Sequence, residues 1–196
     1  MAYSIKEIEE DVKLKFAGKN RLNHILGVRD MALHLGSSLG LDLEKLEIAA
    51  LLHDYTKYDS LEEQIKEIND PVIVERFKDA TAIYHAYAAA NVAREKFQIE
   101  DPIILNAIRY HVYGRIHMNK YEKVLVLADY TEINRQYDSC IRVRNMIDKY
   151  PFDLVMYECE KEMIQALDKI GIQPSEEQYA ILKELEEIKN GIIKNN

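Results

Sequence analysis

The most constraining feature of the chain is a run of apolar residues, Ala49 to Leu52, that leads directly into the polar pair His53-Asp54. Such a run is typical of a buried segment, so the fold must accommodate an imidazole and a carboxylate side by side. Burying these groups costs free energy unless others compensate them, and a shared metal ion is a common compensation. The sequence therefore predicts that other segments supply partners for this pair.

Apolar residues recur at helical spacing through most of the chain, with capping signals between the segments. Asn20 and Asp42 are predicted N-caps, and Ser60-Leu61-Glu62-Glu63 matches a capping box. Asp101-Pro102 places a proline where a helix favours it, in the first turn. The expected helices are 5–16, 20–35, 43–53, 60–69, 79–97, 102–113, 120–137, 152–170 and 176–194.

These segments leave no room for a sheet. None shows the alternation of a strand, and the chain has only 7 Gly and 4 Pro, few for a strand-and-turn protein. We expect an all-α fold, a helical bundle with additional C-terminal helices. With 47% hydrophobic residues the chain suits one domain over 1–196. Its motif-bearing core would cover about 21–135 and its C-terminal helical part 152–194.

The composition argues against several classes of function. A formal net charge of −8 disfavours nucleic acid as the main partner. The acidic N-terminus does not match a signal peptide, and no apolar run reaches the roughly 20 residues of a membrane helix. Cys140 and Cys159 form no CxxC motif and favour reduced thiols. We expect a cytoplasmic protein with neither a membrane nor a nucleic-acid partner.

The partners that the His-Asp pair needs are available on other predicted helices. A single histidine on an apolar face is more often a hydrogen-bonded structural residue than a ligand. Several such groups would each need a separate partner, whereas convergence on shared metal would satisfy all of them. The predicted ligands are His24, His53, Asp54, His85, His111 and Asp129.

This ligand set suits two metal ions. Adjacent helical residues point about 100° apart, so the His-Asp pair can face two neighbouring ions, and a carboxylate can bridge them. One ion would be held by His24, His53 and Asp129, the other by His85 and His111, with Asp54 between them. Imidazole and carboxylate ligands suit divalent transition metals, iron first, with manganese, cobalt and zinc as alternatives. Two such ions would activate a water and neutralise phosphate oxygens.

Four segments in order resemble the motifs of the HD-domain metal-dependent phosphohydrolases. Within this family, the segments more specifically resemble those of the YqeK branch, the bacterial symmetrical diadenosine tetraphosphate hydrolases. The metal ligands of that branch follow the pattern H…HD…H…H…D. The segments are Arg21-Leu22-Asn23-His24-Ile25-Leu26-Gly27-Val28, Leu51-Leu52-His53-Asp54-Tyr55-Thr56-Lys57, Ala107-Ile108-Arg109-Tyr110-His111 with Gly114, and Ala128-Asp129-Tyr130-Thr131-Glu132-Ile133-Asn134-Arg135. The chain departs at Val112-Tyr113, where the family has two threonines, and at Ile133, where it has a proline.

The resemblance implies an HD-domain helical bundle, cleavage of diadenosine tetraphosphate to two ADP through water activated at a binuclear metal site, and a homodimer. Two alternatives stay open. The first is another HD-type nucleotide phosphohydrolase, such as a nucleotidase, a dNTP hydrolase or a cyclic-nucleotide phosphodiesterase. The second is a nucleotide-binding module without catalysis.

Five residues outside the ligand set are candidates for substrate contact. Lys57, one turn beyond His53 on a continuing helix, would face incoming phosphate. Arg21 and Arg135 could clamp a polyphosphate or form surface ion pairs. His117 follows Gly114 in a polar loop, where a histidine could protonate a leaving phosphate or be idle. We expect Asp54, Lys57 and His117 in catalysis, and Arg21, Lys57, Gly114, His117 and Arg135 in substrate binding.

Overall fold

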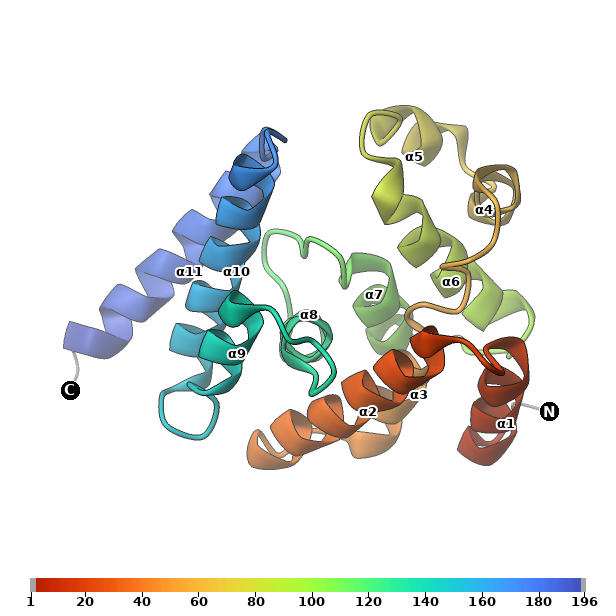
Figure 1. Cartoon of the computed structure of the whole chain (residues 1–196), viewed down its shortest axis with the longest axis horizontal. Coiled ribbons are helices and arrows are strands. Elements are labelled where there is room, and N and C mark those ends of the chain that lie inside the picture. Colours follow the sequence, from red (N-terminus) through yellow and green to blue (C-terminus); the bar gives the residue numbers. More distant parts are fainter. Residues whose placement is uncertain (1–2, 195–196) are drawn as a thin grey trace.

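The computed structural model describes residues 3–194, and it is helical throughout, with no strand in this part of the chain (Figure 1). The all-α prediction is therefore confirmed. The helices are α1 (Ile5–Lys15), α2 (Asn20–Ser38), α3 (Leu43–Leu52), α4 (Leu61–Ile68), α5 (Pro71–Arg76), the 3-10 helix η1 (Thr81–Ile83), α6 (Tyr84–Glu95), α7 (Pro102–Tyr110), α8 (Lys120–Thr131), α9 (Asp138–Arg144), α10 (Phe152–Lys169) and α11 (Glu176–Lys194).

Most of the predicted helix starts are confirmed by their hydrogen bonds. Asp42 accepts from the backbone of α3, Ser60 and Glu63 form the predicted capping box, and Asp101 caps α7 ahead of its proline. The prediction for Asn20 was wrong, because Asn20 is the first residue of α2 and Lys19 is its N-cap without a side-chain hydrogen bond. The chain enters α2 from a tight turn, which satisfies part of the helix end through the backbone.

Several predicted helices end earlier than expected, and among them α7 stops at Tyr110 instead of 113. Helix α3 stops at Leu52, and the backbone continues in tight turns, with Tyr55 N bonded to Leu52 O at 3.1 Å. Lys57 is therefore not on a continuing helix. Helix α8 stops at Thr131 instead of 137, and a separate helix, α9, follows. Arg144 of α9 donates hydrogen bonds to the carbonyl oxygens of Thr131 and Glu132. These bonds stabilise a turn at the end of α8 instead of a further helical turn.

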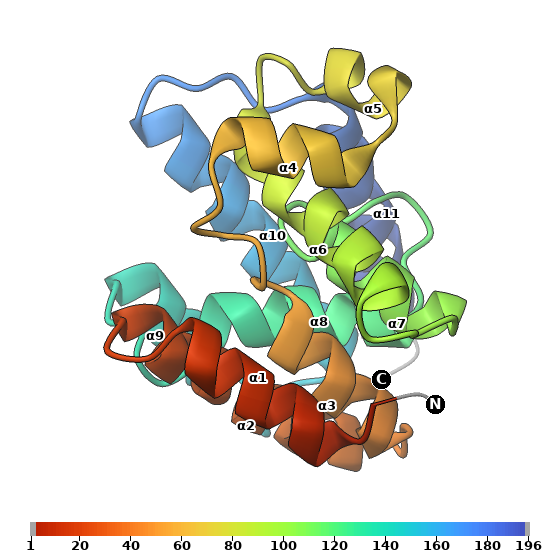
Figure 2. The ribbon, with the colours of Figure 1, turned by 90° about the vertical axis from the view of Figure 1, so that its right-hand side faces the viewer.

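Helix α8 lies at the centre of the bundle and is buried over most of its length. Helices α2, α3 and α7 pack against it on one side, and α9 and α10 on the other, as Figures 1 and 2 show. Helix α6 packs on both α4 and α7, while α11 packs on α10. None of the helices in the described residues combines the length and apolar character that crossing a bilayer requires. The elements that carry the predicted ligands therefore meet around α8 and α7.

Candidate metal centre

Five helices bring the six predicted ligands together in one buried cluster, which we call the His/Asp centre. His24 lies on α2, His85 on α6 and Asp129 on α8, while His53 and His111 are the C-caps of α3 and α7. Asp54 follows α3 directly. All four histidines and Asp54 are buried, and Asp129 is partly exposed.

The two oxygens of Asp54 face two different pairs of histidines. Its Oδ2 lies 3.4 Å from His53 Nε2 and 3.5 Å from His24 Nε2. Its Oδ1 lies 3.1 Å from His85 Nε2 and 3.8 Å from His111 Nε2. Asp54 therefore stands between two halves of the centre, which is the position that a bridging carboxylate needs.

Asp129 belongs to the half that contains His24 and His53. Its Oδ1 lies 3.0 Å from His24 Nε2 and 3.9 Å from His53 Nε2. In the other half, the Nε2 atoms of His85 and His111 are 3.3 Å apart. In each of two groups, the potential ligand atoms lie within 4.8 Å of one another: His24 with His53 and Asp129, and His53 with Asp54 and His111.

All four histidines are oriented by their Nδ1 atoms. Nδ1 of His53 bonds Ala50 O at 2.6 Å, and Nδ1 of His85 and His111 bond the carbonyls three residues earlier in the same way. His24 Nδ1 instead bonds Glu132 Oε1 at 3.1 Å. A carbonyl or carboxylate can only accept, so Nδ1 carries the proton in each ring. The Nε2 atoms thus keep the role of ligand, an arrangement usual for metal-binding histidines.

The electrostatics of the centre show how strongly its groups interact. Burial alone would lower the pKa of His24, but contacts with Asp129, Asp54 and Glu132 raise it to about 10. Burial would raise the pKa of Asp54, yet the histidines hold it well below its usual range. For His111, burial and the neighbouring imidazoles lower the pKa to about 3. The carboxylates around His24 therefore favour positive charge at that point.

These side chains fit divalent transition metal. Nε2 of His24 and of His53 are buried without a hydrogen-bond partner in the described residues, although buried polar atoms are normally satisfied. The donor set has imidazole nitrogens and carboxylate oxygens and no thiolate, which suits iron, manganese, cobalt or zinc. A bound metal ion would coordinate the two unpartnered nitrogens and would also neutralise the negative charge of the surrounding carboxylates.

Three cations stand at the edge of the centre. Arg21 Nη1 lies 2.7 Å from Asp54 Oδ2, and Arg135 Nη2 lies 2.8 Å from Asp129 Oδ1. The Nε atom of each arginine is buried and has no hydrogen-bond partner among the described residues. Lys57 Nζ lies 3.3 Å from His85 Nδ1, and burial lowers its pKa. The tight turns after α3, rather than a continuing helix, carry Lys57 to this position.

The other two predicted residues lie elsewhere. The side chain of His117 is 85% exposed, and its Nδ1 pairs with Glu184 of α11 at 3.1 Å. Gly114 has a φ of +70° and lies in the wall of a separate cavity against α11. The structure does not bring either residue into contact with the His/Asp centre.

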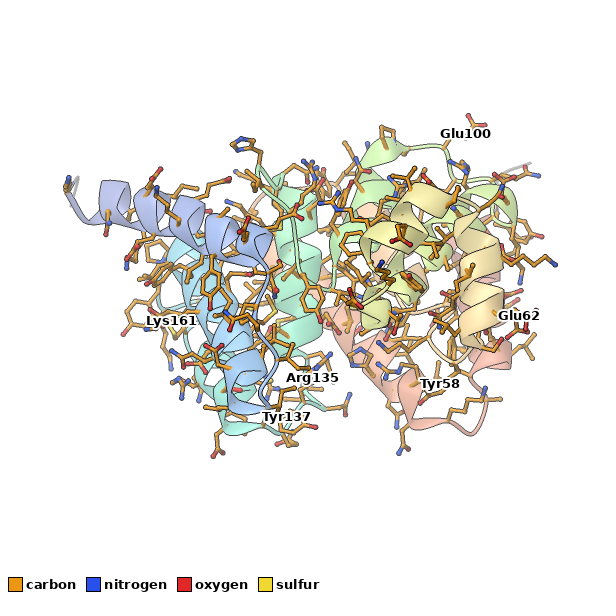
Figure 3. All side chains as sticks on the ribbon, turned by 90° about the horizontal axis from the view of Figure 1, so that it is seen from above. Tyr58, Glu62, Glu100, Arg135, Tyr137 and Lys161 are labelled. Carbon is orange, nitrogen blue, oxygen red and sulfur yellow. The ribbon has the colours of Figure 1, made fainter. Side chains whose placement is uncertain are left out.

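Two cavities open from the centre and share Arg21 and Arg135. The inner cavity, about 360 Å³, is lined by Asp54, Lys57, His85, His111, Tyr113 and Tyr130, among others. The outer cavity, about 570 Å³, is lined by His24, Tyr58, Asn134 and Tyr137, among others. Figure 3 shows Tyr58 near one edge of the molecule, with Arg135 and Tyr137 across from it toward the C-terminal helices.

Sequence reasoning missed four residues of the site, namely Glu132, Gly27, Tyr58 and Tyr137. Glu132 is 1% exposed and holds His24 through Nδ1. Gly27 allows this contact, because a Cβ there would lie 2.4 Å from Glu132 Oε2. The sequence places Glu132 on the same helical face as Asp129, three residues later, which was a usable signal. Its partner His24 on α2 is 108 residues away, so the sequence did not reveal the contact. Tyr58 and Tyr137, exposed aromatics at the outer cavity, carried no signal in the sequence.

The helical bundle and the converging imidazoles and carboxylates define a protein of the His-Asp metal-centre class. Residues 21–134 match the HD domain family. The symmetrical bis(5'-nucleosyl)-tetraphosphatase of Halalkalibacterium halodurans is 36% identical over 64% of this chain and 68% of its own length. The protein of that name from Bacillus subtilis is 35% identical over 66% of this chain and 70% of its own length.

A solved structure from Clostridium acetobutylicum, described as an HD superfamily hydrolase involved in NAD metabolism, superposes with a TM-score of 0.86. It is 25% identical and covers 95% of this chain and 99% of that one. The chain belongs to the HD domain family, in the group of relatives named symmetrical bis(5'-nucleosyl)-tetraphosphatase. The family suggested by the sequence motifs is therefore confirmed.

Proposed function

We propose that the protein hydrolyses diadenosine tetraphosphate symmetrically, to two molecules of ADP. One observation carries the proposal: the two oxygens of Asp54 face two pairs of histidine Nε2 atoms, in the wall of an inner cavity that shares Arg21 and Arg135 with an outer one. A centre of this form suits attack on a phosphorus in the middle of a polyphosphate. The names of the relatives support the same substrate.

The two cavities suit the two ends of such a substrate. Both are lined by Arg21 and Arg135, so a polyphosphate could pass these arginines while its nucleosides occupy opposite sides. Each guanidinium has a buried Nε that lacks a partner in the described part of the chain, and guanidinium groups bind phosphate oxygens well. Tyrosines line both cavities and offer ring faces for a base.

His24, His53 and Asp129 would hold one metal ion and His85 and His111 a second, with Asp54 between them. When bound, such ions supply Lewis-acid activation of water and neutralisation of phosphate oxygens. Imidazole and carboxylate ligands fit iron, manganese, cobalt and zinc, and we propose iron as the first choice among them. Lys57 lines the inner cavity beside His85 and would place a positive charge against the transferred phosphoryl group.

The chain departs from the family motifs at Val112-Tyr113 and at Ile133, and the two departures differ in their relation to the cavities. Val112 and Tyr113 line the inner cavity beside His111, so they touch the space proposed for substrate. Ile133 is 63% exposed and lines neither of the two cavities. Another nucleotide phosphohydrolase activity is therefore the second candidate, favoured by the changed inner wall at Val112-Tyr113.

The experiment is product analysis with the full chain, reconstituted in turn with iron, manganese, cobalt and zinc. Dinucleoside polyphosphates, nucleotides, dNTPs and cyclic nucleotides are each incubated and the products separated by chromatography. Diadenosine tetraphosphate should be the best substrate and give ADP alone. AMP with ATP would contradict symmetrical cleavage, and a better mononucleotide substrate would favour the second candidate. A chain that binds no metal and turns over nothing would favour the non-catalytic module.

A further inference from the structure

A third cavity, separate from the His/Asp centre, lies between the N-terminus of α11 and helices α5, α6 and α7. We call it the α11 cavity, and its volume is about 490 Å³, within the usual range for small-molecule sites. Its walls include Arg76, Phe77, Tyr87, Arg109, Tyr113 and Gln178. Tyr113 is the one residue that lines both this cavity and the inner cavity among the described residues. The two spaces therefore lie on opposite sides of the segment that carries His111.

Aromatic rings form one wall of the α11 cavity. The ring centroids of Phe77 and Tyr87 are 5.5 Å apart, and those of Tyr87 and Tyr110 are 6.1 Å apart. A guanidinium stands over each end of this row, Arg76 over Phe77 at 5.0 Å and Arg115 over Tyr110 at 5.1 Å. Aromatic faces can bind a planar base by stacking.

Arginines are the most frequent charged residues in the cavity wall, although the whole chain carries −8. Four arginines and two acids line it, but Arg94 pairs with Glu95 at 3.0 Å and Arg115 pairs with Glu122 at 2.9 Å. Asp70 caps α5, and Glu177 pairs with Arg76 at 2.7 Å. Arg109 bonds only the Asn106 amide oxygen, at 2.9 Å, and has no carboxylate partner in the described residues. The cavity thus offers an uncompensated charge to an anion.

Buried donors in the wall also lack partners. Gln178 is 5% exposed, and its Oε1 accepts from Ser175 N in the first turn of α11. Its Nε2 is buried without a hydrogen-bond partner in the part of the chain that the structure describes, and so is Nε of Arg115. Such donors are normally satisfied by protein, water or ligand.

We propose that the α11 cavity is a second nucleotide site, which takes a nucleoside mono- or diphosphate with its base against the Phe77–Tyr87–Tyr110 wall and its phosphate toward Arg109. The size, the aromatic wall, the Arg109 guanidinium without a carboxylate partner and the unpartnered donors support this class of ligand together. Because the site does not touch Asp54, it does not depend on the hydrolase activity proposed above.

The test uses the full chain carrying Asp54→Ala, which disables the His/Asp centre but leaves the α11 cavity intact. A fluorescent N-methylanthraniloyl derivative of ADP is titrated and its Kd measured. Adding Arg109→Ala should weaken binding at least tenfold. Adding Arg29→Ala, which removes an arginine of α2 paired with Glu9 and Asp30, should change the Kd less than twofold. Circular dichroism melting shows whether each variant is folded, and Arg109→Gln replaces Arg109→Ala if it is not.

Three outcomes would overturn the proposal. The first is probe binding that neither Arg109 variant weakens, and the second is no binding at all. The third is displacement of the probe by inorganic phosphate as effective as displacement by ADP, which would show an anion site without base recognition.

A kinetic measurement distinguishes a separate site from an extension of the substrate site. In a chain with Asp54 intact, Arg109→Ala should leave the KM for diadenosine tetraphosphate within twofold. A KM that rises in step with the loss of probe binding would make the cavity one end of the substrate site and contradict a separate site. An enzyme inactive on that substrate would affect only the proposed function, because the titration needs no turnover.

Discussion

The molecule buries carboxylates in two very different surroundings. In the His/Asp centre, Asp54 lies beside four imidazoles and Arg21, and its contacts with the histidines, His53 first, hold its pKa well below the usual range against the effect of burial. On α10, Glu160 is fully buried, and neither of its oxygens has a hydrogen-bond partner in the described residues. Burial raises the pKa of Glu160 to about 8. Burial alone therefore does not mark a site, and the convergence of complementary groups does.

The largest effect is expected at Asp54, because it contacts both halves of the centre. Asp54→Ala should lower turnover by roughly 1,000-fold or more, since the substitution removes the carboxylate that would join the two proposed metal sites and thereby impairs water activation. Turnover and metal content are measured together, and Asp30→Ala, at an exposed position of α2, is the control. Near wild-type rates in Asp54→Ala would contradict a functional role for Asp54 and would leave no functional difference between Asp54 and Glu160.

At Glu160, unlike at Asp54, removing the carboxylate is expected to benefit the protein, by raising its stability. The unfolded chain releases this proton near pH 4.5 and the folded chain near 8, so stability is lost as the pH rises between these values. Glu160→Gln should abolish that loss and stabilise the protein at pH 8, on the order of a few kcal/mol at about 1.4 kcal/mol per pKa unit. At pH 5 the two proteins should differ little.

Urea unfolding between pH 5 and 8 measures the effect of Glu160→Gln. Glu158→Gln, on the same helix but paired with Lys161, is the matched control and should show no such trend. A Glu160→Gln protein less stable than wild type at pH 8 would mean that Glu160 is ionised with a stabilising partner.

A smaller effect is expected at Lys57, which contacts the centre without being one of its proposed ligands. Lys57→Met should lower kcat by roughly 10- to 100-fold, because one positive charge beside the phosphoryl group is lost. Metal content should stay unchanged, which separates this role from that of Asp54. Loss of metal in Lys57→Met would show that the lysine supports the centre instead.

The smallest effect is expected at His117. Its side chain is exposed and paired with Glu184, so His117→Ala should change kcat and KM less than twofold. Initial rates across several pH values check this, because a proton donor would alter the profile. A loss above tenfold would restore the catalytic role that the loop position suggested.

Much of the fold could be predicted because helix signals are local. The caps at Asp42, Ser60 and Asp101 depend on residues within one turn, and all three are confirmed. The ends of α3 and α8 could not be predicted in this way. The carbonyls at the end of α8 are bound by Arg144, a residue of the next helix, and no local pattern reveals that contact.

The sequence by itself determined the residue types of the His/Asp centre, their order and their helices. It could do so because buried polar residues on apolar faces need partners wherever they lie. Only the tertiary structure decided that each oxygen of Asp54 faces a different histidine pair, that Glu132 orients His24, and that the α11 cavity exists. These features depend on contacts between side chains distant in the chain, and their distances and directions are fixed only when the helices pack.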